Sequence, residues 1–314
     1  MFPTAAGIGN IASTAMRYVP QLWSPKLLVK FYQTCVIGAI SNTDYEGQIK
    51  QQGDTVYIRS RPTMTINTYV KGQGLTYETL TSTATSLAID QGRSWSFVEN
   101  AVDAKQTDLK NHISEWIDDG SKQLAINIDT AVLGAIYADA HASNRGITAG
   151  AISGNIDLGV ASGAGVALTA STILTKMVQC AQVLKEQNVP QQTPMWFVLP
   201  EWAISLLALS DIKNASLTGD MVSPMRNGKI GQVYRFNVYS SNLLATAAET
   251  SGPAATCTYA LFGTNDALTF ASQLTENESL KNPTDFGMLY RGLQVFGYSV
   301  VKPEALGVLF CKEG

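Results

Sequence analysis

The sequence predicts an α+β fold, and three stretches of the chain support this prediction. Two alternating apolar runs between residues 53 and 98 indicate a long β-hairpin. Apolar residues at three- and four-residue steps indicate one long helix from Gln106 to Tyr137. A helix–strand–helix order over residues 169–210, followed by further strands, indicates an α/β subdomain.

The composition indicates a folded chain whose surface suits extensive contacts with other subunits. The chain has 314 residues, of which 45% are hydrophobic and 15% are charged. This length supports one large domain or two modest ones. Much of the polar surface must therefore come from Thr, Ser, Asn and Gln, which cost less to desolvate than Lys and Glu. A mildly charged soluble protein is the simpler alternative.

The net charge and the cysteines argue against several functional classes. A net charge of −3 disfavours a strong, sequence-independent nucleic-acid binder, but it leaves open a container wall that tolerates nucleic acid. The N-terminal residues do not resemble a signal peptide, and the most apolar early segment is too short to span a bilayer. The sequence has no C-x-x-C pair, which argues against a zinc site and favours reduced thiols. The four cysteines are Cys35, Cys180, Cys257 and Cys311.

The hairpin is expected to be unusually long. GDTVYIRSRP, which starts at Gly53, and SLAID, which contains Leu87 and Ile89, alternate as half-buried strands do. Gly72 and Gly74 place the tip at VKGQG. Arms that reach roughly 40 Å need outside support, because an isolated two-stranded ribbon is marginal in water. A neighbouring molecule is the expected support, and a disordered surface loop is the alternative.

The long helix is expected to be a structural spine. Asp103 is its expected N-cap, and residues 106–137 would run about 48 Å. Gly120 in its middle costs stability unless something packs closely there. Its apolar stripe is expected to pack against the rest of the subunit, through Leu109, Ile113, Trp116, Leu124 and Ile128.

Two further features complete the expected organisation. Ser24 as N-cap and Pro25 at the first helical position predict an early helix that extends to Ile40. Residues 141–167 are rich in Gly, Ala and Ser, and they form the best candidate for a domain boundary.

Signals of catalysis or metal binding are scarce. The two histidines are His112 and His141, and His112 shares a helix face only with Glu115, whereas a metal site needs more ligands. The sequence contains no dinucleotide fingerprint, P-loop or nucleophile elbow. A Ser/His/Asp triad stays open because triads are spatial, but no residue is nominated for one. We expect no enzymatic activity, no cofactor and no metal.

The order of these parts resembles the major capsid proteins of tailed bacteriophages with the Hong Kong 97-type fold. The likeness covers nearly the whole chain and is most specific in SPMRNGKIGQVYRFNVYSSNLL. Arg235 departs from the pattern, because relatives often have Gly before the Phe. LAINIDTAVLGAI, with Asp129, resembles the end of the family's spine helix. The coat-like motif comprises Arg226, Asn227, Gly228, Gly231, Phe236 and Tyr239.

The resemblance implies a division of the chain into six parts. They are an N-terminal arm and first helix (1–45), an extended E-loop hairpin with flanking strands (46–100), the spine helix of a peripheral or P domain (101–140), an A domain (141–267), P-domain strands (268–302), and a C-terminal return to the A domain (303–314).

The resemblance also implies a function. Subunits of this family assemble as pentamers and hexamers into an icosahedral head shell around double-stranded DNA, in the virion, after assembly in the host cytoplasm. Implied partners are a portal, a separate scaffolding protein and a cement or decoration protein, with no membrane. Lys71 is the candidate for the Lys–Asn crosslink that some relatives form. The hairpin tip would contact an adjacent subunit through Val70, Lys71, Gly72, Gln73, Gly74 and Leu75.

Two other functions stay open. An encapsulin-like nanocompartment shell would share the fold, and it would need an interior groove for cargo peptides. An α/β metabolic enzyme with a flexible lid would need a cluster of titratable groups in a pocket, for which two separate histidines give little support.

Overall fold

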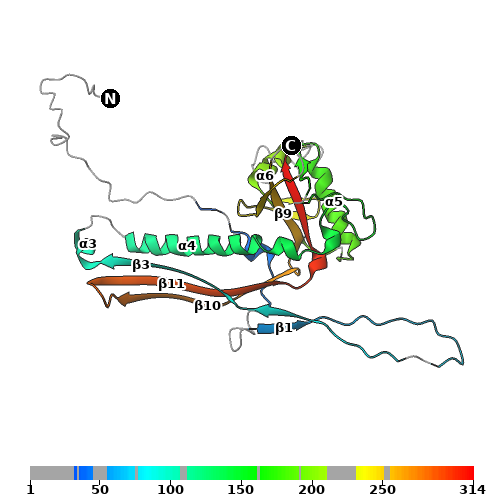
Figure 1. Ribbon diagram of the computed structural model, residues 1–314, viewed down its shortest axis with the longest axis horizontal. Helices are drawn as coiled ribbons and strands as arrows, with labels where there is room; N and C mark the ends of the chain where they lie inside the picture. Colours follow the sequence, from blue (N-terminus) through cyan, green and yellow to red (C-terminus); the bar gives the residue numbers. More distant parts are fainter. Residues whose placement is uncertain are drawn as a thin grey trace, which may run out of the picture.

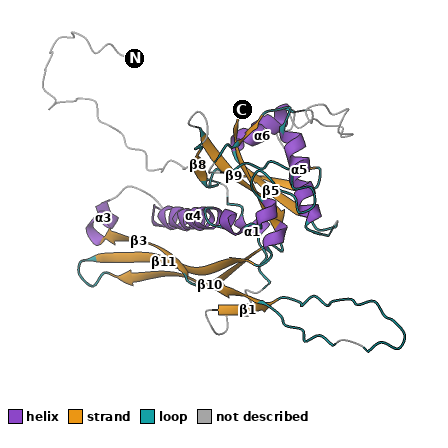
Figure 2. Cartoon of the chain, turned by 45° about the vertical axis from the view of Figure 1, so that its right-hand side comes forward, coloured by secondary structure: helices purple, strands orange, loops and turns teal. Residues whose placement is uncertain are grey.

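The chain forms an elongated molecule with three β-sheets (Figures 1 and 2). A seven-stranded sheet with its helices forms a compact unit. A long three-stranded sheet and helix α4 extend to one side of it, and a hairpin extends to the other. The structure, a computed structural model, describes residues 32–33, 35–44, 55–74, 77–106, 112–160, 163–190, 192–210, 231–250 and 255–314.

The seven-stranded sheet has the strand order β4-β12-β9-β5-β7-β6, and β8 pairs with β9. The helix–strand–helix order predicted over residues 169–210 is confirmed as α5, β5 and α6. The elements are β4 (Val166–Leu168), α5 (Ile173–Glu186), β5 (Met195–Leu199), α6 (Glu201–Leu209), β6 (Gln232–Val233), β7 (Phe236–Ser240), β8 (Thr246–Ala248), β9 (Thr256–Thr264) and β12 (Leu306–Glu313).

Strand β5 is apolar at every position because both of its faces are covered. Phe197 and Leu199 belong to a core that includes residues of α5 and α6. Trp196 and Val198 point the other way, into a second core that includes Ile128 of α4. A strand buried on both faces reads as a continuous apolar run rather than an alternating one. The second core thereby fixes the spine helix to the seven-stranded sheet.

The three-stranded sheet carries α4 on one face. Its order is β10-β11-β3, with antiparallel pairing throughout. Alternate residues of β3 are half-buried or buried, and they include Trp95, Phe97 and Glu99, which contact α4. The elements are β3 (Gln91–Asn100), α3 (Ala101–Gln106), α4 (His112–Leu133), β10 (Leu268–Lys281) and β11 (Gly287–Val300).

The long helix is shorter than the sequence predicted. Helix α4 has 22 residues, about 33 Å, and residues 107–111 lie outside the described part of the chain. Asp103 was expected as the N-cap, but it lies inside the separate helix α3. After Leu133 comes Gly134, which has poor helix propensity, and the chain continues in a 3₁₀ turn, η1 (Ile136–Asp139).

The prediction of an early helix that extends to Ile40 is wrong for most of the residues that the structure describes there. Ser24 and Pro25 lie outside the described residues, and residues 32, 33, 35 and 36 are not helical. Only one turn, α1 (Ile37–Ile40), is helical, and its two isoleucines are buried in the core that contains the end of α4. The chain before this turn bonds to α4 instead of to itself.

Most of the described part of the Gly-, Ala- and Ser-rich segment forms a connection without strands, and its last residues enter β4 of the seven-stranded sheet. It contains η2 (Ala142–Asn144) and an isolated bridge between Ala149 and Ile156. The buried Asn144 amide donates to the carbonyl oxygens of Glu304 and Leu306, at 2.7 and 2.9 Å. These bonds tie the segment to the turn η4 (Pro303–Ala305) that leads into β12.

Candidate functional site

The hairpin is anchored to the long sheet at its base. Strands β1 (Thr55–Arg59) and β2 (Ala84–Ala88) pair antiparallel, and Leu87 is buried against Ala271 and Val295 of the long sheet. Strand β2 crosses β11 at Gly297, where a Cβ atom would lie 2.1 Å from the Ala88 carbonyl oxygen. Only glycine permits this approach.

Beyond its base the hairpin has little internal support. The Ser60 N–H donates to the Thr83 carbonyl at 2.8 Å, and the Thr65 N–H donates to Glu78 Oε2 at 3.1 Å. The described residues between 60 and 83 contain no strand. The predicted long strand arms are therefore wrong, because paired strands are confined to the five-residue base. The arms extend away from the body of the molecule (Figures 1 and 2).

The hairpin turns where the sequence predicted. The Gln73 N–H donates to the Val70 carbonyl at 3.1 Å. Gly72 has a φ of +89°, which favours glycine. Lys71 and Gly74 are exposed beside it, and Leu75 lies outside the described residues. The role of these residues in contacts between subunits stays a prediction.

The hairpin exposes large apolar side chains. Ile66 is 89% exposed and Tyr77 is 90% exposed. Contiguous exposed apolar surface on a soluble protein marks an interaction site, and tyrosine supplies large contact area at interfaces. The exposed apolar residues of the hairpin are Tyr57, Met64, Ile66, Tyr69, Val70, Tyr77 and Leu80.

Glycines make room for a tryptophan between the spine helix and the long sheet. A Cβ atom at Gly120 of α4 would lie 2.9 Å from the Trp95 ring, and one at Gly292 of β11 would lie 2.4 Å from Trp95 Nε1. Gly120 therefore has the close packing partner that its helical position demands. The helix could not lie this close to β3 with a larger residue at position 120.

The packing role predicted for the spine stripe is only partly met. Trp116 is 41% exposed, and its ring contacts Phe97 of β3 edge-on. The buried half of the stripe lies nearer the C-terminal end of α4, where the helix meets the second core. Ile128 is buried, Ile113 and Leu124 are half-buried, and Leu109 lies outside the described residues.

Asp129 of α4 is a buried carboxylate that accepts hydrogen bonds from a distant part of the chain. Its side chain is 5% exposed, and its Oδ2 accepts the N–H groups of Val36 and Ile37 at 2.5 and 3.3 Å. Burial raises the pKa of Asp129, although the two backbone hydrogen bonds act to lower it. The sequence signal that could have indicated this role is the position of an acidic residue directly after Ile128, in the apolar stripe of the helix.

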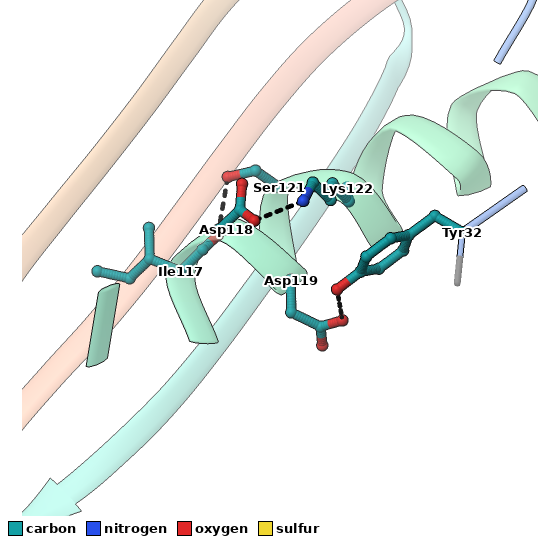
Figure 3. A network of polar contacts seen from close by, with 6 residues as sticks. All are labelled: Tyr32, Ile117, Asp118, Asp119, Ser121 and Lys122. Atoms are coloured by element: carbon teal, nitrogen blue, oxygen red, sulfur yellow. Dashed lines mark hydrogen bonds and ion pairs between the residues drawn. The ribbon is translucent and has the colours of Figure 1, made fainter. Parts of the chain in front are cut away.

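A second contact joins the same stretch of chain to α4 (Figure 3). The Tyr32 hydroxyl donates to Asp119 Oδ1 at 2.8 Å. Lys122 Nζ lies 4.7 Å from the centre of the Tyr32 ring, and it bonds to Asp118 Oδ2 at 2.6 Å. No sequence pattern indicated this aromatic–cation contact, because Tyr32 and Lys122 are far apart along the chain.

Titratable groups of the described residues form pairs rather than a catalytic cluster. His112 Nε2 lies 2.7 Å from Glu99 Oε1, and both side chains are nearly buried between α4 and β3. Lys312 Nζ lies 2.5 Å from Glu249 Oε2, whose other oxygen accepts the Gly165 N–H. In the described part of the chain, no three His, Cys, Asp or Glu residues converge as metal ligands. No described helix is long and apolar enough to cross a membrane.

Comparison with solved structures decides the fold. A structure of Mycobacterium phage Che8 is similar with a TM-score of 0.75 and 22% identity, over 93% of this chain and 97% of that one. The capsid of cyanophage P-SCSP1u has a TM-score of 0.72 and 14% identity, over 95% of this chain and 94% of that one. The mature capsid of bacteriophage PhiM1 has a TM-score of 0.69 and 16% identity, over 97% and 95%.

The chain has the fold of phage capsid proteins. No protein-family model matches the sequence, and no curated protein sequence is significantly similar to it. The capsid fold is thus recognisable in the order and arrangement of elements, at identities where sequence comparison is weak.

Within this capsid fold, the described part of the coat-like motif forms an edge of the seven-stranded sheet. Phe236 is buried against the rings of Phe197 and Phe262. The Gly231 carbonyl accepts the Val238 N–H at 3.1 Å, and Tyr239 is half-buried in β7. Arg226, Asn227 and Gly228 lie outside the described residues.

The unusual Arg235 of the capsid fold lies in a tight turn between β6 and β7. Val233 pairs with Phe236, so the turn has two residues, Tyr234 and Arg235. Tyr234 has a φ of +54°, a backbone conformation that disfavours a large side chain. The positive φ of this turn therefore falls on Tyr234 and not on Arg235, where the sequence departs from the coat-like pattern.

Proposed function

We propose that this chain is a major capsid protein that assembles into the head shell of a tailed phage. The observation that carries the proposal is the hairpin of residues 55–88 on a capsid fold. It projects from the body, has little internal support and exposes apolar side chains such as Ile66 and Tyr77. A subunit that functioned alone would gain nothing from exposing this surface to water.

The hairpin is proposed to lie across an adjacent copy of the chain. This contact joins two different surfaces of the subunit, and contacts of this kind close into rings when the rotation allows. The proposed rings are pentamers and hexamers in an icosahedral shell. The tip residues 70–75 make part of the contact, and Lys71 is the candidate for a covalent crosslink.

The six parts of the chain take their roles from this assembly. Residues 1–45 form the arm and first helix, 46–100 the E-loop, and 101–140 the spine. Residues 141–267 form the A domain, 268–302 the strands of the P domain, and 303–314 the return to the A domain. Strand β12 pairs with β9 and β4 in the seven-stranded sheet, which supports the last assignment.

The proposed shell encloses double-stranded DNA and is located in the virion, after assembly in the host cytoplasm. A net charge of −3 suits a wall that does not hold DNA tightly during packaging. The proposed partners are a portal, a separate scaffolding protein and a cement or decoration protein.

Electron microscopy of the purified protein, expressed with and without its neighbouring genes, tests the proposal. We expect closed icosahedral shells, and nuclease-protected double-stranded DNA in particles from infected cells. Protected DNA separates a phage head from an encapsulin-like compartment. A stable monomer under every condition would contradict assembly.

Removal of the hairpin tip tests the proposed contact. Deletion of residues 70–76 is expected to leave a folded monomer and to abolish shells. Circular dichroism and the melting temperature serve as the control for folding. Normal shell yield from the deletion variant would refute the role of the tip.

A further inference from the structure

We infer that Asp129 is a positioning residue for the N-terminal arm, and that Tyr32 and Asp129 together clasp the chain onto α4. The carboxylate of Asp129 accepts two successive backbone N–H groups at the start of α1. The first N–H groups of a helix have no partner within it. Asp129 supplies that partner from another element, and it fixes where the chain enters the body.

The two contacts define a direction as well as a place. Asp119 and Asp129 are ten positions apart on α4, which is about 15 Å along its axis. Tyr32 and Val36 are four positions apart, which is about 13 Å in an extended chain. The two contacts fall in the same order along both segments, so the chain from Tyr32 to Val36 runs in the same direction as α4.

The chain after the clasp is held independently. Ile37 and Ile40 are buried in the second core. The Asn42 N–H then donates to the Leu268 carbonyl at 2.8 Å, and the Phe270 N–H donates to the Asn42 carbonyl at 3.0 Å. The clasp is therefore not the main attachment of α1. Its specific effect is to hold Tyr32 and Val36 against α4, which sets the place where the chain enters the body.

Hydrogen exchange of the unassembled subunit tests the clasp without reference to assembly. Asp129→Leu removes the oxygen that accepts both amides, and the Val36 and Ile37 amides should exchange at least about tenfold faster. Asp129→Asn should keep most of the protection, because both amides donate to a single oxygen. Glu115→Gln, an exposed carboxylate change on the same helix, is the control and should change neither rate. Unchanged protection in Asp129→Leu would overturn the inference.

The Tyr32 contact gives a second test if Asp129→Leu does not fold. Tyr32→Phe removes only the hydroxyl that bonds to Asp119. Trypsin cleavage after Lys30, followed by mass spectrometry, should become several-fold faster. An unchanged cleavage rate would overturn the role of Tyr32 in the clasp.

The consequence for assembly rests on the proposed function and is measured separately. If the clasp directs the arm toward a neighbouring copy, Asp129→Leu should lower the yield of closed shells by at least about tenfold. Asp129→Asn, which keeps the acceptor oxygen, should form shells in nearly normal yield. Lost amide protection with a normal shell yield would overturn the role in aiming the arm. Failure of the wild-type protein to form shells would instead count against the proposed function, and the exchange result would stand.

Discussion

Two carboxylates of this chain lie in contrasting environments, and pH should act on them with opposite sign. Asp129 is buried, which raises its pKa above the ordinary value of 3.8. For Glu186, burial acts to raise the pKa, but hydrogen bonds from Ser153, Gln182 and Ile152 outweigh it and lower the pKa to about 2. The charged form is disfavoured by folding at Asp129 and favoured at Glu186.

The Glu186 carboxylate should stabilise the fold at neutral pH and lose this effect in acid. Its folded pKa lies below the ordinary value of 4.5, so its contribution is present above that pH and is lost as the pH falls toward about 2. Glu186→Gln should lower the free energy of unfolding by about 1 kcal/mol at pH 7. Denaturant unfolding at pH 7 and pH 3 measures this difference. An equal deficit at both pH values would contradict the ionic origin.

The Asp129 carboxyl should behave in the reverse way. Its folded pKa is raised, so its contribution to stability is fully present below pH 3.8 and is lost as the pH rises through the folded value. Relative to Asp129→Asn, the wild-type protein should therefore gain stability as the pH falls. The control is Asp103→Asn, an exposed change in α3. A wild-type protein that loses stability relative to Asp129→Asn in acid would contradict the raised pKa.

At the scale of elements, the spine helix and the long sheet are matched through Trp95 and its two glycines. Gly120→Ala should destabilise the subunit by about 1–3 kcal/mol, because the new methyl group meets the Trp95 ring. Helix propensity alone would predict a gain of about 1 kcal/mol. The sign of the change in the free energy of unfolding therefore shows whether packing against Trp95 or helix propensity dominates at position 120.

A double-mutant cycle tests the same pairing. In a Trp95→Ala background the ring is absent, and Gly120→Ala should become neutral or stabilising by up to about 1 kcal/mol. Gln123→Ala, on an exposed face of α4, is the control and should behave alike in both backgrounds. Equal effects of Gly120→Ala with and without Trp95 would show that the ring is not the obstacle.

At the scale of the whole molecule, the exposed hairpin links the fold of one subunit to the assembly of many. Tyr77→Asp should leave the melting temperature unchanged, because the side chain is 90% exposed. It should lower the yield of shells by at least about tenfold, because a charge would be buried in an apolar contact. Tyr77→Phe keeps the ring and should assemble normally. Normal shell yield from Tyr77→Asp would place Tyr77 outside the contact.

The sequence by itself determined the features that depend on local pattern. The continuous apolar run of β5, the amphipathic helix α5 and the turn at Gly72 were all predicted, because strand, helix and turn preferences act over a few residues. The order of these elements was enough to indicate the capsid fold, which the comparison with solved structures then bore out.

Only the tertiary structure decided the features that depend on residues far apart in the chain. Tyr32, Cys35 and Val36 fit a helical pattern, but they are not helical, and Tyr32 and Val36 bond instead to Asp119 and Asp129 of α4. Trp116 has the spacing of a core residue, yet it is 41% exposed beside Phe97, while the Trp95 ring lies against Gly120 and Gly292. Periodicity describes a face of one element, and burial depends on what the rest of the chain places against that face.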